Sequence, residues 1–78
     1  MGRATPASDG GDGGLKTSWP ELVGFVMLNA ADQINIDRPD VFPAFYVLPT
    51  PLPNDYNPKR VILVGDQRDV VVRTPVVG

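Results

Sequence analysis

The chain contains no cysteine and no histidine among its 78 residues. Without cysteine it can form neither a disulfide framework nor a thiolate zinc site. Without histidine it lacks the usual general base, a common metal ligand, and the Ser-His and Cys-His pairs that activate nucleophiles. We therefore expect no enzymatic activity, no catalytic residues, no metal site and no cofactor.

Positive charge is also scarce, since Lys and Arg number 7 against 9 Asp and Glu, for a net charge of −2. A nucleic-acid-binding domain normally carries a basic face, and here the basic residues are scattered. No apolar run approaches the length of a membrane span, and no secretory signal is visible after Arg3. We expect a monomer that binds neither nucleic acid nor membrane, and the compartment stays open.

The length allows one domain, and its small core depends on good packing because no disulfide can reinforce it. Residues 1–16 include Gly10, Gly11, Gly13 and Gly14 and almost nothing to bury. We expect a flexible tail at 1–16 and a folded domain at 17–78.

The first half of the domain carries helical signals. Ser18 is a candidate cap for a short turn that begins near Pro20, and Gly24 breaks that turn. Between Phe25 and Ile36, apolar residues recur at three- and four-residue spacing, which predicts an amphipathic helix of about three turns. The helix is expected to end at Asp37-Arg38-Pro39, because the residue before proline avoids helical angles.

The second half reads as strands. Val41–Leu48 is apolar, but Pro43 lies inside it, so this strand should begin late or bulge. Arg60–Val64 is the second strand, Gly65–Asp69 a turn, and Val70–Val72 a third strand. The long connection before Arg60 suggests that the first two strands are parallel. We predict an α+β fold, with one amphipathic helix packed on a small mixed sheet and a long exposed loop. The predicted core is Trp19, Leu22, Val23, Ala30, Ile34, Val47, Val61, Leu63 and Val72.

The connection between the first two strands is the candidate functional segment. Pro49, Pro51 and Pro53 alternate there, which favours an extended and stiff path. A stiff, extended segment loses little entropy when it binds a cleft as a strand. From these residues alone, an ordinary surface turn is the stronger interpretation.

Two motifs change that balance. They are Thr17-Ser18-Trp19-Pro20-Glu21-Leu22-Val23-Gly24, and Asp55-Tyr56-Asn57-Pro58-Lys59-Arg60-Val61 running on to Pro75-Val76-Val77-Gly78. Together they resemble the potato inhibitor I family of serine protease inhibitors, which includes eglin-like and barley chymotrypsin inhibitor-like members. The resemblance covers Thr17 to Gly78. It implies an inhibitor of subtilisin- or chymotrypsin-like serine endopeptidases that binds like a substrate through the loop.

The resemblance also assigns residues. The reactive bond would be Asn54–Asp55, and Arg60 and Gly78 would support the loop through charged hydrogen bonds. Arg60 is expected to act as a bidentate donor to Asp55 or to the Gly78 carboxylate. The implied protease-binding loop is Pro51, Leu52, Pro53, Asn54, Asp55, Tyr56 and Asn57.

Several positions depart from the family pattern. Ile62 replaces a second supporting arginine, and Pro53 replaces a threonine that supports the loop. Val26 stands where a Ser or Thr usually caps the helix. Asn54 is small and polar, where a large residue is common, and an unpaired amide in an apolar pocket costs about 1–3 kcal/mol. We expect inhibition of such proteases to be weaker than is usual for the family, or redirected to another protease.

Alternatives remain open. A shifted alignment of the loop makes Leu52 a competing specificity residue. The altered loop support favours a non-inhibitory storage or binding protein that keeps the fold. A small enzyme is a weaker alternative. A third alternative is an engineered chain, which nothing in the sequence tests. The family is chiefly known from plants, so the resemblance implies a role in wounding and defence.

Overall fold

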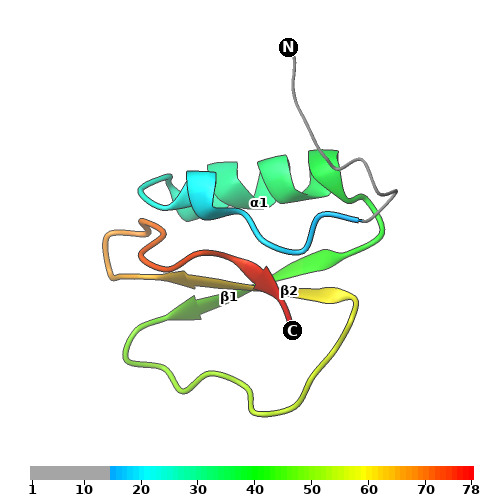
Figure 1. The fold of residues 1–78 in the computed structure, drawn as a ribbon. Helices are drawn as coiled ribbons and strands as arrows, with labels where there is room; N and C mark the ends of the chain where they lie inside the picture. The colour runs from blue at the N-terminus through cyan, green and yellow to red at the C-terminus, as the bar shows by residue number, and fades with distance from the viewer. Residues whose placement is uncertain (1–14) are drawn as a thin grey trace.

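The computed structural model describes residues 15–78, so the tail predicted at 1–16 lies almost wholly outside the described residues. One α-helix lies across one face of a small sheet (Figure 1). The elements in chain order are a 3₁₀ turn η1 (Pro20–Leu22), α1 (Met27–Asp37), β1 (Phe42–Val47), β2 (Arg60–Gly65) and β3 (Val76–Val77). The predicted α+β fold is confirmed.

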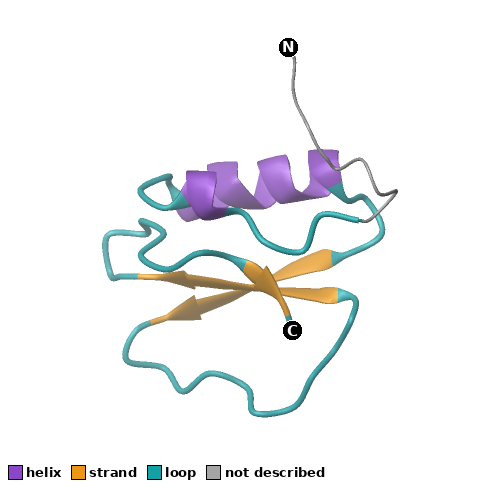
Figure 2. Cartoon of the chain, viewed as in Figure 1, coloured by secondary structure: helices purple, strands orange, loops and turns teal. Residues whose placement is uncertain are grey.

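The sheet is mixed, with the strand order β1-β2-β3. β1 and β2 are parallel, in a register that runs from Phe42 opposite Arg60 to Val47 opposite Gly65. β3 pairs antiparallel with β2. The connection from β1 to β2 contains no helix and passes on the side of the sheet away from α1 (Figure 2). The predicted parallel pair is therefore confirmed.

Pro43 does not delay or bulge β1, so that expectation is wrong. β1 begins at Phe42, one residue after the predicted Val41 and one residue before Pro43, and its pairing with β2 is unbroken. The Phe42 N–H donates to Lys59 O at 2.8 Å and the Leu48 N–H donates to Gly65 O at 2.9 Å. The main-chain N–H and C=O groups of the even-numbered residues of β1 thus point toward β2. The main-chain groups of Pro43 point to the other edge of β1, so its missing N–H removes no hydrogen bond between the strands.

The third strand is also not where the sequence predicts it. Val70 and Val71 make only isolated bridges, to Val26 and Gly65 respectively. The third strand is β3, whose two residues lie opposite Ile62 and Val61. The expected turn before Val70 is present, with Asp69 at a φ of 63° and the Asp66 carboxylate accepting from the Arg68 N–H at 2.9 Å.

The start of η1 differs from prediction. Trp19, not Ser18, is the N-cap of η1, because Ser18 is bridged to Val76 as an extended residue. Gly24 has a φ of 95°, a conformation that side chains disfavour, and it ends the turn as expected.

Helix α1 begins two residues later than predicted and lacks a capping side chain. Its N-cap is Val26, which makes no side-chain capping bond. Phe25 is held in extended pairing, since its carbonyl accepts from the Val71 N–H at 2.8 Å. The helix ends at Asp37, as the following Arg38-Pro39 predicts.

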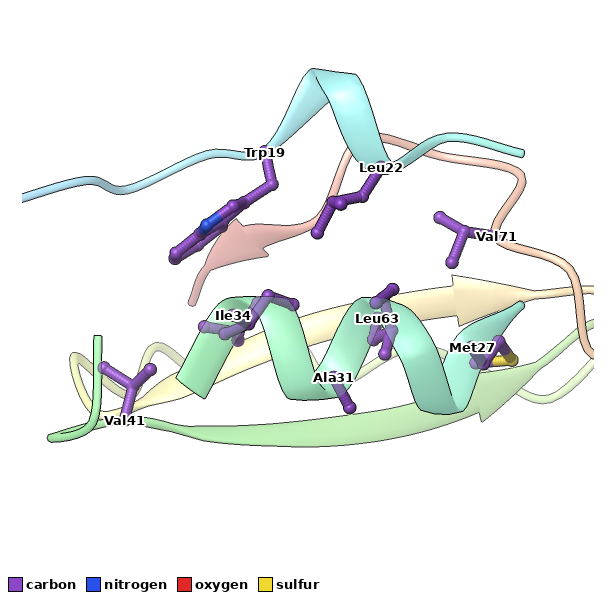
Figure 3. Packing of buried hydrophobic residues seen from close by; sticks show 10 residues of the cluster. Trp19, Leu22, Met27, Ala31, Ile34, Val41, Leu63 and Val71 are labelled. Atoms are coloured by element: carbon purple, nitrogen blue, oxygen red, sulfur yellow. The ribbon is translucent and has the colours of Figure 1, made fainter. Parts of the chain in front are cut away.

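The core fills the space between α1 and the sheet (Figure 3). The structure confirms most of the predicted core. The buried residues are Trp19, Leu22, Ala30, Ile34, Val61 and Leu63, and Val47 is partly buried against them.

The prediction that Val23 and Val72 belong to the core is wrong, because their exposed fractions are 46% and 39%. Only Val71 of the run Val70-Val71-Val72 turns fully inward, and a continuous apolar run gives no alternation from which to choose it. The prediction omitted the buried residues Met27, Ala31, Val41, Val64 and Val71.

Two contacts connect residues at the edge of the core to neighbouring elements. The Trp19 indole N–H donates to Asp37 Oδ2 at 2.9 Å, which satisfies its one polar atom. Met27 packs directly on the main chain of Gly65, where a Cβ atom would collide with the Met27 side chain. Gly65 therefore lets the start of α1 approach the end of β2.

Candidate functional site

The loop from residue 48 to residue 59 is fixed at both of its ends. Near β1, the Thr50 N–H donates to Val47 O at 2.9 Å. Near β2, the Asn57 N–H donates to Gly78 O at 2.8 Å and the Arg60 N–H donates to Asn57 O at 3.1 Å. The free part of the loop is therefore short, and its two ends cannot drift apart while the sheet is intact.

Between these ends, residues 51–56 make few contacts with the rest of the domain. No main-chain N–H of this stretch has a hydrogen-bond partner within residues 15–78. Asn54, Asp55 and Tyr56 are exposed, while Leu52 and Pro53 are half-buried. The stretch therefore presents unpaired main-chain groups and the Asn54–Asp55 peptide to solvent.

Among residues 15–78, Arg60 is the one side chain outside this stretch that donates hydrogen bonds to it. Its Nη2 donates to Asp55 O at 2.9 Å, to Asp55 Oδ1 at 3.3 Å and to Gly78 O at 2.5 Å. The Arg60 side chain is 12% exposed, so these charge-assisted bonds are only partly weakened by water. Arg60 thus connects the middle of the loop to β2 and to the end of β3.

The Arg60 contact differs from the expected bidentate fork. A single nitrogen, Nη2, makes all of the contacts to Asp55 and Gly78. The Nε–H of Arg60 is buried and has no partner in the described part of the chain.

Ile62 lies one pleat further along β2, on the same face as Arg60. Its Cδ1 would be 3.3 Å from a Cβ atom placed on Gly78, which is itself buried. Where the resemblance places a second arginine, this domain therefore has an apolar contact with the residue that Arg60 also holds. That contact supplies packing and no hydrogen bond to the loop.

A second charged cluster secures the end of the loop near β2, and sequence reasoning missed it. The buried Arg38 donates through Nε and Nη2 to the two carboxylate oxygens of Asp40, at 3.0 and 2.6 Å. Lys59 Nζ donates to Asp40 Oδ2 at 3.2 Å. The hydrogen bonds from Arg38 and then Lys59 hold the pKa of Asp40 well below its usual range. The spacing Arg38-Pro39-Asp40 was the only signal in the sequence, and it does not reveal Lys59.

Other chemistry finds little support in the geometry. No three His, Cys, Asp or Glu side chains within residues 15–78 are grouped so that they could hold a metal ion. No helix in that same range is long and apolar enough to cross a membrane. Asp66 lies in its turn, where hydrogen bonds from the exposed Arg68 lower its pKa.

Comparison with known proteins gives a consistent result. The model of the potato inhibitor I family matches residues 10–78. A chymotrypsin inhibitor of Lumbricus terrestris is 42% identical over 64 residues, which are 82% of this chain and 74% of that protein. Subtilisin inhibitor 1 of Phaseolus angularis is 43% identical over 63 residues, or 81% of this chain and 68% of that protein. The crystal structure of bitter gourd trypsin inhibitor superposes with a TM-score of 0.80 at 29% identity, covering 83% of this chain and 96% of that one. The family match, the sequence identity and the shared fold together show that this chain belongs to the potato inhibitor I family.

Proposed function

We propose that this protein inhibits a subtilisin- or chymotrypsin-like serine endopeptidase by placing residues 51–57 in the enzyme's cleft like a substrate. The observation that carries the proposal is the exposed stretch between two fixed ends, with Arg60 bound to Asp55. The family relatives named as chymotrypsin and subtilisin inhibitors support it. Catalysis would come from the protease alone.

The unpaired main-chain groups supply the binding energy. An extended segment adds to an enzyme's cleft as a strand, through the N–H and C=O groups that residues 51–56 leave free. Pro51 and Pro53 restrict the loop before binding, so less entropy is lost in the complex. The stretch is therefore prepared for a protease cleft.

Arg60 and the fixed ends would also slow net cleavage of the loop. Hydrolysis of the Asn54–Asp55 bond would leave a carboxylate on Asn54 and an amine on Asp55. Arg60 would keep the new amine of Asp55 in place, and the Val47–Thr50 turn would hold the other end. Both ends would stay close enough for the peptide bond to form again, so net cleavage would be slow.

The structure favours Asn54 over Leu52 as the residue that enters the primary pocket. Leu52 is half-buried against its own domain, while Asn54 is exposed and adjoins the residue that Arg60 holds. Pro53 offers no N–H to the enzyme. These features support weaker inhibition of proteases with apolar pockets.

The storage-protein alternative and the role in wounding and plant defence are not part of the proposal. The relatives reported above are named as inhibitors, and none of them points to a storage protein. They come from Lumbricus terrestris as well as from plants, so a specific role in wounding or plant defence gains no support. We expect a monomer in complex with one protease molecule.

A titration against subtilisin, chymotrypsin, trypsin and elastase tests the proposal. We expect stoichiometric inhibition of at least one of these enzymes, with the Asn54–Asp55 bond largely intact by mass spectrometry. Rapid cleavage of the loop with no loss of protease activity would contradict it.

A further inference from the structure

Asn54 presents a side-chain carboxamide to solvent. The residue is exposed, and its amide has no hydrogen-bond partner within residues 15–78. A carboxamide offers two N–H donors and one carbonyl acceptor. All of these groups are thus free for a partner, at the position next to the residue that Arg60 anchors.

The chemistry of that side chain decides which pocket can accept it. An apolar pocket would strip water from the amide without replacing its hydrogen bonds, which is unfavourable. A pocket with a buried carboxylate, such as that of trypsin, requires a cation, which Asn54 lacks. A pocket that supplies both an acceptor and a donor would satisfy the amide and reject side chains without it.

The flanking residues do not offer a better candidate. Leu52 is half-buried, and Pro53 has a fixed ring with no polar group. The Asp55 carboxylate is already paired with Arg60 at 3.3 Å. Of the residues that flank the proposed reactive bond, Asn54 is the one with an exposed, neutral polar group that has no hydrogen-bond partner within residues 15–78.

We propose that the preferred partner is an endopeptidase whose primary pocket binds a side-chain carboxamide, which is an enzyme that cleaves after asparagine. This inference rests on the proposed function of the loop. Asn54 is then the specificity-determining residue. Its side chain alone accounts for the expected weak inhibition of proteases with apolar pockets.

The test uses three proteins: the wild type, Asn54→Leu and Asn54→Asp. Each is titrated against an endopeptidase that cleaves after asparagine and against chymotrypsin. Asn54→Asp keeps the shape of the side chain but replaces the amide donor with a charged acceptor. Because Asn54 is exposed, all three should share one unfolding midpoint, which is measured first.

We expect the wild type to inhibit the asparagine-specific enzyme about a hundredfold more tightly than either variant. Asn54→Leu should inhibit chymotrypsin at least about tenfold more tightly than the wild type. Mass spectrometry should show the Asn54–Asp55 bond intact in the wild-type complex.

The outcomes separate the inference from the function on which it rests. If Asn54→Leu inhibits chymotrypsin but the wild type does not inhibit the asparagine-specific enzyme, or is simply cut by it, the inference is wrong and the inhibitory loop stands. Equal inhibition of that enzyme by all three proteins also overturns the inference. If none of the three inhibits either enzyme, the inference is wrong, and the titration against subtilisin, trypsin and elastase then decides whether the proposed function stands.

Discussion

The core above the sheet and the loop below it are stabilised by opposite kinds of interaction. The core is a cluster of buried apolar side chains, from Trp19 at one border to Met27 at the other. The free stretch of the loop is exposed and depends on one nitrogen of Arg60. Burial is additive and has no direction, whereas a hydrogen bond depends on the position of its partners.

This difference separates stability from activity. Losing a core contact should lower the free energy of unfolding without changing the loop in molecules that remain folded. Losing the Arg60 contact should disturb the loop while most of the core persists. The following changes test that separation, beginning with the largest expected effect.

Leu63→Ala should cost the most stability. Leu63 lies on β2 and is fully buried beneath α1 (Figure 3), so the change leaves a cavity and should lower the free energy of unfolding by about 2–5 kcal/mol. Urea unfolding measures the loss, and protease titration below the transition measures the loop. A loss of inhibition larger than the loss of folded protein would show that core and loop are coupled.

Arg60→Ala should have a smaller effect on stability and a larger one on the loop. We expect a loss of about 1–3 kcal/mol, because Gly78 O and Asp55 O lose a charged donor. Cleavage of Asn54–Asp55 by subtilisin should accelerate, as followed by mass spectrometry. Arg68→Ala is the matched control, since Arg68 also pairs with an aspartate but its side chain is 81% exposed. Equal cleavage rates for both variants would contradict a role for Arg60 in holding the loop.

Asp40→Asn should alter the pH dependence of stability. The pKa of Asp40 is lowered in the folded state, chiefly by its hydrogen bond with Arg38, so its stabilising effect is present above the unfolded pKa of about 3.9. That effect disappears as the pH falls through the lower folded pKa. Asp40→Asn should therefore melt below the wild type at pH 7, and the two melting temperatures should converge in acid.

Asp32→Asn serves as the control for this pH series. Asp32 is exposed and makes no hydrogen bond with another side chain in the described range. The difference in melting temperature between Asp32→Asn and the wild type should be the same at every pH of the series. A constant gap between Asp40→Asn and the wild type at every pH would contradict the proposed linkage.

Val72→Thr should have the smallest effect. Val72 is 39% exposed, so the change should alter the free energy of unfolding by no more than about 0.5 kcal/mol. Its neighbour Val71 is 1% exposed, and Val71→Thr should cost about 1–3 kcal/mol because a hydroxyl is buried. Similar costs for the two variants would show that both side chains contribute to the core.

Much of the fold could be predicted because several residues carry strong local signals. The spacing of Ala30 and Ile34 indicates a helix, and the large ring of Trp19 indicates an anchor. Failures came where partners distant in sequence decide. Ser18 is extended because Val76 pairs with it, and β3 is too short to show a period.

The candidate site was predictable only in part. The resemblance drew attention to Asn54, Asp55 and Arg60, and the structure brings Arg60 to both Asp55 and Gly78. The use of a single Arg60 nitrogen for both acceptors could not be predicted, because sequence spacing does not specify which guanidinium atoms reach a partner. The link from Asp40 to Lys59 joins residues 19 positions apart and arises only when the strands pair.

The place of Pro43 on the open edge of β1 also bears on how the molecules behave at high concentration. β1 carries no charged residue, and Phe42 and Phe45 are 49% and 45% exposed, features that invite edge-to-edge aggregation. A neighbouring strand that docked there would leave an acceptor without a donor opposite Pro43. The same proline that fits β1 without breaking the sheet therefore discourages other molecules from extending it.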